Sequence, residues 1–284
     1  MKLSFTKTTL LAMALTTAAF AAADGHILAR GFYGGSTVLI HTQTDGTVIS
    51  TKKLKKLPAG GERFAVGQLP GFIVGGADVA VQIGNTFVDL YRYDANGNRV
   101  ADRHLAVYGR VVGMGDLNRN SRNELIIQKD SGALIGYEFD RNLNNKAQVY
   151  NFPLLGAEVG QYTQIGGVYD NQVLLQKPGF EYKLKLATFK ADGIQAVTNI
   201  YDPTTDMVHY PTNPFVWDPI YDSIGGFINQ GGDGQRQVFI NHRAGRVQVE
   251  WSFDTTMTTF FRTAADNVET PLPNKNYKVL ASGN

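Results

Sequence analysis

Residues 125–139 read Leu-Ile-Ile-Gln-Lys-Asp-Ser-Gly-Ala-Leu-Ile-Gly-Tyr-Glu-Phe. Three apolar residues and an amide come first, a turn at Ser131-Gly132 follows, and residues 134–139 then alternate with a period of two. A short apolar run bounded by turn residues is typical of a strand buried on both faces, and alternation is typical of a half-buried strand. The stretch therefore predicts two neighbouring strands joined by a tight turn.

The same pattern of three apolar residues, one polar residue and a turn occurs five times. The five copies are Val38-Leu39-Ile40-His41, Val79-Ala80-Val81-Gln82, Leu125-Ile126-Ile127-Gln128, Val173-Leu174-Leu175-Gln176 and Val238-Phe239-Ile240-Asn241. The polar marker residue recurs at intervals of 41, 46, 48 and 65 residues. A period of about 40–50 residues with four short strands in each unit is the signature of a β-propeller.

This periodicity predicts an all-β fold, with residues 22–284 forming one β-propeller of about five four-stranded blades. Six blades are the alternative, if segments before Phe32 or after Phe260 complete another unit, and a tandem sandwich is a second alternative. One unit cannot cover its own apolar faces, so closure of the ring is expected to supply the core. We expect residues 277–280, Tyr-Lys-Val-Leu, to pair with the N-terminal blade and close it.

Composition agrees with this fold class. The chain has 284 residues, 43% of them hydrophobic, with 31 Gly, 13 Tyr and 16 Phe. Glycine is frequent in turns and aromatic residues favour strands, so many short strands are expected rather than long helices. Cysteine is absent, and stability is therefore expected to come from packing, ring closure or bound ions.

The first 21 residues have the pattern of a secretory signal peptide. Lys2 and Lys7 form a basic region, residues 10–20 are apolar, and residues 19–21 read Ala-Phe-Ala. The apolar run is too short to span a bilayer, which needs about 20 residues, and no later segment is longer or more apolar. A secreted or periplasmic protein without membrane insertion is expected.

Removal of this segment leaves 25 basic residues, which is 27 less the two lysines, against 25 acidic residues. A neutral chain is a poor nucleic-acid binder. Lys52, Lys53, Lys55 and Lys56 form the one basic cluster. Leu54 and Leu57 alternate through the cluster, which favours a solvated edge strand over a ligand patch.

The longest interval between markers contains an insertion near residues 199–219, where four prolines oppose a central strand or a helix. Long loops in compact domains are often functional, and aromatic rings stack on sugars or anchor partner proteins. The alternative is that these rings pack the insertion onto the propeller. The aromatic binding candidates in this segment are Tyr201, Tyr210, Phe215 and Trp217.

Residues 115–127 read Gly-Asp-Leu-Asn-Arg-Asn-Ser-Arg-Asn-Glu-Leu-Ile-Ile. Oxygen side chains at loop positions 1, 3, 5 and 9, with a backbone carbonyl at position 7, suit a hard cation that takes six or more oxygen ligands. Calcium is the candidate cofactor. The alternative is a calcium-free turn in which Asx side chains bond the backbone.

This loop resembles the FG-GAP repeat of integrin-α-type propellers and their bacterial relatives, in which Asp-x-Asp/Asn-x-Asp/Asn-Gly-x-x-Asp precedes an apolar strand. The resemblance covers one repeat well. It implies that Asp116, Asn118, Asn120 and Glu124 supply side-chain oxygens and that Arg122 supplies its carbonyl. In this sequence Ser121 replaces the turn glycine of the family, and Glu124 replaces an aspartate.

The marker residues His41, Gln82, Gln128, Gln176 and Asn241 form the other candidate set. At the same point of each inner strand, they either satisfy neighbouring backbone groups or line a polar channel mouth that binds a sugar or a peptide.

Motifs for nucleophilic hydrolysis, nucleotide binding and transition-metal binding are missing from the sequence. The carboxylates Asp89, Glu138, Glu181 and Glu250 lie on or beside second strands, where they are expected to face solvent or pair with basic residues. The sequence therefore favours an exported binding or scaffolding module with a carbohydrate or protein partner at the propeller rim. The alternatives are a secreted carbohydrate-active enzyme on a five-bladed propeller and a structural accessory of an envelope or secretion assembly.

Overall fold

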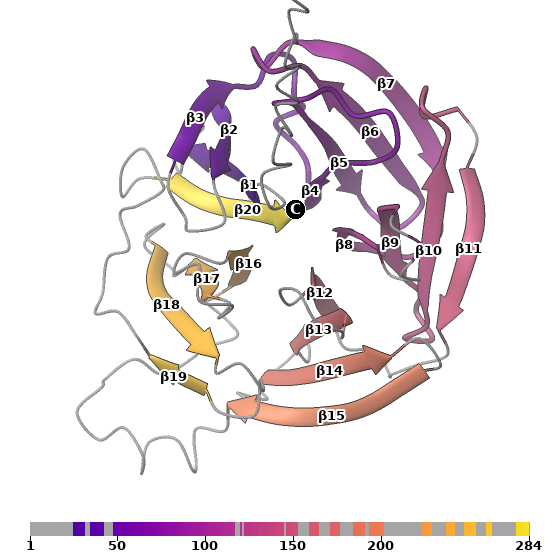
Figure 1. The fold of residues 1–284 in the computed structure, drawn as a ribbon, viewed down its shortest axis with the longest axis vertical. Coiled ribbons are helices and arrows are strands. Elements are labelled where there is room, and N and C mark those ends of the chain that lie inside the picture. The colour runs from indigo at the N-terminus through magenta and orange to yellow at the C-terminus, as the bar shows by residue number, and fades with distance from the viewer. Residues whose placement is uncertain are drawn as a thin grey trace, which may run out of the picture.

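The computed structural model describes residues 25–31, 35–42, 48–116, 120, 122–144 and 277–283 together with the backbone of the strands between residues 146 and 262. The described strands form five antiparallel sheets of four strands each. Figure 1 shows these sheets arranged around a common centre as the blades of a propeller. The fold class predicted from the repeat is confirmed.

The blades are numbered here from the one that contains the N-terminal strand. Blade 1 consists of β20 (Tyr277–Gly283), β1 (Gly25–Gly31), β2 (Thr37–Thr42) and β3 (Val48–Lys53). Blade 2 consists of β4 (Arg63–Gly67), β5 (Ala77–Ile83), β6 (Phe87–Tyr93) and β7 (Arg99–Ala106). Blade 3 consists of β8 (Arg110–Gly115), β9 (Glu124–Gln128), β10 (Leu134–Phe139) and β11 (Lys146–Phe152). Blade 4 consists of β12 (Val159–Gln164), β13 (Asn171–Gln176), β14 (Leu184–Lys190) and β15 (Gly193–Tyr201). Blade 5 consists of β16 (Ser223–Ile228), β17 (Gln237–Asn241), β18 (Val247–Phe253) and β19 (Phe260–Arg262).

The innermost strands of the blades form a closed circle of contacts. Strand β4 contacts β8 and β20, β12 contacts β8 and β16, and β16 contacts β20. The circle is closed by the C-terminal strand, because β20 pairs antiparallel with β1 and occupies the innermost place of blade 1. This is the closure that the apolar C-terminal segment predicted.

The core lies in the seams between blades. One cluster joins Leu28 and Leu39 of blade 1 to Val79 and Tyr93 of blade 2. A second cluster joins blade 2 to blade 3, and Leu90 and Ile127 are fully buried in it. Burial of each large aliphatic side chain contributes about 1.5–3 kcal/mol, so neighbouring blades stabilise one another. This explains why β5 and β9 are buried on both faces.

The repeated tripeptides do not lie in the innermost strands. Four of them belong to the second strand of a blade: β5, β9, β13 and β17. The copy at residues 38–41 lies in β2, which is the third strand of blade 1, because β20 adds a strand inside β1. The first copy is therefore displaced by one strand. A sequence repeat cannot show this displacement, since it arises from pairing with the opposite end of the chain.

The basic cluster lies at the outer edge of blade 1. Strand β3 is an edge strand and ends at Lys53, and Lys55 and Lys56 follow it with exposed side chains. Leu54 is buried beneath them in the seam with blade 2. The prediction of a solvated edge strand is confirmed for β3, while the burial of Leu54 was not predicted. Across the described residues, no helix is long and apolar enough to cross a membrane.

Candidate functional site

The marker residue Gln82 joins blade 2 to blade 3. Its Nε2 donates to the carbonyl of Gly109 at 2.6 Å, and its Oε1 accepts from the backbone N–H of Val111 at 2.8 Å. The side chain is fully buried. Both hydrogen-bonding groups of the amide are used at the start of β8, so Gln82 satisfies backbone groups of the neighbouring blade.

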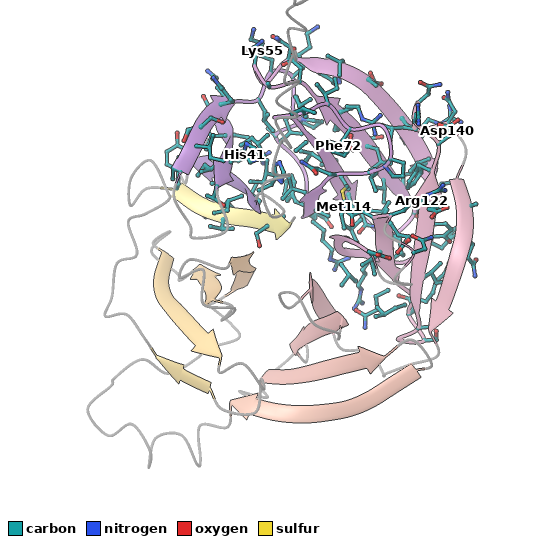
Figure 2. The ribbon with its side chains drawn as sticks, in the orientation of Figure 1. His41, Lys55, Phe72, Met114, Arg122 and Asp140 are labelled. Atoms are coloured by element: carbon teal, nitrogen blue, oxygen red, sulfur yellow. The ribbon has the colours of Figure 1, made fainter. Side chains whose placement is uncertain are left out.

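In blade 1 the position that corresponds to Gln82 is Arg30, in the second strand. The Arg30 guanidinium donates to the carbonyls of Ala59 at 2.6 Å and Pro58 at 2.9 Å, in the segment that leads to blade 2. Arg30 therefore hydrogen-bonds backbone groups at the seam between blades 1 and 2, as Gln82 does at the seam between blades 2 and 3. His41 lies one strand further out, in β2, and does not complete the set (Figure 2).

The other marker residues occupy the positions expected for them along the chain. Gln128 is buried at the end of β9, and Gln176 and Asn241 end the backbone paths of β13 and β17. The reading in which these amides line a polar channel mouth stays a prediction.

The predicted cation loop connects β8 to β9. Asp116 Oδ1 accepts from the backbone N–H of Asn120 at 2.9 Å, and Asn120 Oδ1 accepts from the backbone N–H of Arg122 at 2.9 Å. Glu124 is fully buried at the start of β9, and Asn118 lies outside the described residues. Asn120 therefore forms an Asx turn with Arg122, and Asp116 bonds the backbone four residues on; cation loops and calcium-free loops both use such bonds.

Among the described side chains, no group of three or more His, Cys, Asp or Glu is placed to hold a metal ion. The predicted ligand set differs from such a group because amide and backbone oxygens make up most of it. Calcium binding at this loop stays a prediction.

Glu138 joins this loop, which the sequence did not reveal. Asn120 Nδ2 donates to Glu138 Oε1 at 2.7 Å, and Arg122 Nη1 lies 3.7 Å from Glu138 Oε2. Figure 2 shows Arg122 on blade 3 together with Asp140. The sequence predicted that Glu138 faces solvent or pairs with a basic residue, and the contact with Arg122 agrees with this, but the sequence did not connect Glu138 to this loop. Leu125 pairs with Tyr137 in the hairpin, so residues 124 and 138 are the next residues on the two strands. This register is the feature of the sequence that could have placed Glu138 near the loop.

A second surface cluster lies on the outer strands of blade 2, and we call Phe87, Asp89 and His104 the aromatic platform. The Phe87 and His104 rings stack with centroids 4.8 Å apart and an interplanar angle of 23°. His104 Nδ1 lies 2.6 Å from Asp89 Oδ1. Asp89 and His104 face each other across β6 and β7, which places the three side chains on one side of the sheet.

The aromatic platform is open to solvent, and the buried residue Tyr91 hydrogen-bonds its carboxylate. Phe87 is 47% exposed, and the His104 side chain is 65% exposed. Tyr91 is buried next to it and donates from its hydroxyl to Asp89 Oδ2 at 3.3 Å. Burial and the Asp89 carboxylate raise the pKa of Tyr91, so the phenol remains a donor at neutral pH. The platform thus combines an exposed ring pair with a carboxylate whose position is fixed by two partners.

The loop aromatics predicted to bind a ligand are not placed by the structure. Tyr201 ends the backbone path of β15, so the insertion begins after it, and Tyr210, Phe215 and Trp217 lie outside the described residues. The predicted signal peptide, residues 1–21, lies outside the described residues as well.

Comparison with known proteins finds similarity at the level of the fold. No family model and no curated protein matches the chain. A solved structure of a single-site mutant of the Aleuria aurantia lectin with Fucα1-6GlcNAc is 13% identical and has a TM-score of 0.50; the match covers 87% of this chain and 81% of that chain. A mercury derivative of the fucose-specific lectin from the same organism is 13% identical, with a TM-score of 0.49 and coverages of 87% and 80%. That lectin is a six-bladed β-propeller. The likeness therefore concerns the β-propeller architecture, here with five described blades.

Proposed function

We propose that this protein is an exported β-propeller that binds carbohydrate on its surface and acts as a binding or scaffolding module. The observation that carries the proposal is the aromatic platform. A sugar ring presents an apolar C–H face and a rim of hydroxyl groups, and therefore needs an aromatic surface beside hydrogen-bonding groups. Phe87 and His104 offer the ring surface, and Asp89 offers acceptor oxygens next to it.

Two carboxylates of the described surface are held in place by neighbouring side chains. Asp89 is held by His104 and Tyr91, and Glu138 by Asn120 and Arg122. Such fixed hydrogen-bonding groups orient hydroxyl groups of a ligand. The fold likeness to a lectin whose structure contains a fucose disaccharide supports the same class of ligand.

The proposal includes three features predicted from the sequence. Residues 1–21 are removed on export, the loop that begins at Asp116 binds a structural calcium ion, and the aromatic insertion near residues 199–219 adds contacts at the rim. The calcium loop and the aromatic insertion are tested separately from the platform in the Discussion, because they depend on different residues.

The test of the proposal is binding of the mature chain to an array of glycans, followed by affinity measurement on the best ligand. Phe87→Ala is expected to weaken that affinity about ten-fold or more, as loss of an aromatic contact does at a binding site. Tyr108→Ala is the matched control, because Tyr108 is a 67% exposed aromatic residue of the connection between blades 2 and 3. The control is expected to bind like the unchanged protein.

Three outcomes would overturn the proposal. The mature chain binds no glycan, both variants bind equally well, or the glycan is cleaved and the product accumulates. The last outcome would instead indicate a carbohydrate-active enzyme.

A further inference from the structure

A pair of histidines lies where the two ends of the chain meet. His26 of β1 is opposite His41 across β2 and opposite Gly283 across β20. The two imidazole rings stack with centroids 4.7 Å apart and an interplanar angle of 15°. Exposed fractions are 1% for His26 and 8% for His41. The stack therefore touches the strand pairing that closes the ring.

The side chains of this pair point into the seam between blade 1 and blade 2. His26 lies two residues from Leu28, on the same side of β1, and Leu28 packs with Phe64 and Val79 of blade 2. The backbone of Gly76, which precedes β5, lies near enough to His26 to affect its pKa, but neither buried ring nitrogen of His26 has a hydrogen-bond partner among the described residues. Figure 2 shows His41 on the side of blade 1 that is turned toward blade 2. A change in the charge of the pair therefore alters the packing between blade 1 and blade 2.

The described strands packed around His26 offer little compensation for a positive charge on its ring. Ser50 lies opposite His41 across β3, and Gly283 lies opposite His26 across β20, so both cross-strand partners are uncharged. The charged residues on the described strands packed around the pair are Arg30, Lys52, Lys53, Arg63, Asp78 and Lys278. Five of these are basic, and the carboxylate among them, Asp78, is ion-paired with Arg92.

Protonation of the folded protein is therefore opposed. Burial lowers the pKa of His26 from 6.5 to about 3, the charge of His41 adds to the lowering, and the Gly76 backbone opposes it. The unfolded chain takes up this proton first as the pH falls. The contribution of His26 to stability is complete above about pH 6.5 and is lost progressively between pH 6.5 and 3.

We propose that His26 and His41 form a proton-sensitive latch on the ring closure. At neutral pH the His26 ring is uncharged and stacks on His41, and the stack holds blade 1 against blade 2. In acid the opened form of this seam takes up on His26 a proton that the closed seam excludes, and the attachment of β1 and β20 loosens before the other blades do. The latch acts through the two termini because blade 1 is the blade built from both ends of the chain.

The test is hydrogen exchange of the mature chain at pH 7.5, 6.0 and 5.0, corrected for the intrinsic pH dependence of amide exchange. Between pH 7.5 and 5.0 we expect protection to fall about ten-fold or more in β1 and β20, and by much less in β8 and β9 of blade 3. The double variant His26→Phe/His41→Phe keeps two stacked rings without titratable nitrogen atoms. Its β1 and β20 are expected to retain their protection at pH 5.0.

The matched control is His104→Gln, which removes an exposed histidine from blade 2 and is expected to show the acid response of the unchanged protein. The latch is wrong if the double variant loosens in acid as the unchanged protein does, or if β8 and β9 lose protection together with β1. An NMR titration of the unchanged protein covers the case in which the double variant does not fold. The His26 ring is then expected to stay neutral at pH 5, and its protonation near pH 6.5 would overturn the proposal.

Discussion

Arg92 and Asp78 form a buried ion pair across β5 and β6, with 2.7 Å between Arg92 Nε and Asp78 Oδ1 and 3.1 Å between Arg92 Nη2 and Asp78 Oδ2. Side-chain exposure is 5% for Arg92 and 0% for Asp78. The same guanidinium donates to the carbonyls of Pro70 and Arg141, the second of which belongs to blade 3. One side chain therefore neutralises a buried carboxylate and ties two blades together.

Loss of this guanidinium is expected to be costly. Burial raises the pKa of Asp78, and the contacts with Arg92 and the Leu69 N–H limit the rise. Arg92→Met leaves the carboxylate buried without its counter-charge and is expected to lower the free energy of unfolding by about 3–5 kcal/mol. Urea denaturation at pH 7 measures this. Arg103→Met, which removes an exposed arginine of β7, is the control, and equal losses for the two variants would contradict the assignment.

The amide of Gln82 is expected to matter for stability because both of its polar groups bond the next blade. Gln82→Leu preserves volume and leaves the Gly109 carbonyl and the Val111 N–H without their partner. The expected loss is about 1–3 kcal/mol in the free energy of unfolding. Ile83→Ala is a suitable control, since Ile83 is the neighbouring residue and is 56% exposed. A Gln82→Leu variant as stable as the control would show that the seam does not depend on this amide.

Substitution of two glycines with positive φ distinguishes the cost of backbone strain from the cost of a steric clash. Gly84 has φ 67° with open space around a Cβ, whereas Gly97 has φ 74° and a Cβ there would lie 2.5 Å from the Lys53 carbonyl oxygen. Gly84→Ala is expected to cost about 1 kcal/mol, the price of the left-handed conformation. Gly97→Ala is expected to cost more, because the turn must also move away from blade 1. Thermal melting of both variants checks the order, and the reverse order would contradict the packing.

Calcium binding at the loop that begins at Asp116 makes a prediction about melting. A ligand that binds only the folded state raises the melting temperature, so the mature chain is expected to melt at a higher temperature with calcium than with a chelator. Asp116→Ala should abolish the difference. Asp94→Ala removes a carboxylate that bonds the backbone of Asn96 and Asn98 in another turn and should leave the difference intact. If the melting temperature of the unchanged protein does not respond to calcium, the prediction of a calcium site is wrong.

The aromatic insertion near residues 199–219 is expected to contribute to ligand retention. Trp217→Ala should reduce binding to the best glycan about ten-fold, as removal of an aromatic anchor commonly does, without changing the melting temperature. Thr205→Ala, in the same insertion, is the control for a change that removes no ring. If Trp217 instead packs the insertion onto the propeller, the melting temperature falls in the variant while the affinity of the folded fraction is unchanged.

The sequence predicted the candidate sites unevenly. Asp116, Asn120 and Arg122 were found because their contacts are local, made within a few residues along the chain. The sequence did not connect Glu138 with Asn120 or His104 with Asp89, since these partners lie 18 and 15 residues apart. Such contacts depend on which residues the hairpin register places near each other. For Asp89 and His104 a bulge between Arg92 and Tyr93 also shifts that register.

The amino-acid sequence by itself determined the strands, the turns and the need for a ring, because apolar runs buried on both faces cannot be covered within one blade. Tertiary structure alone decided that β20 enters blade 1 as its innermost strand. That pairing moved residues 38–41 to the third strand and brought His26 opposite both His41 and Gly283. The physical reason is that periodicity reports the environment of each residue along the chain, whereas the identity of its neighbour depends on where the two ends of the chain meet.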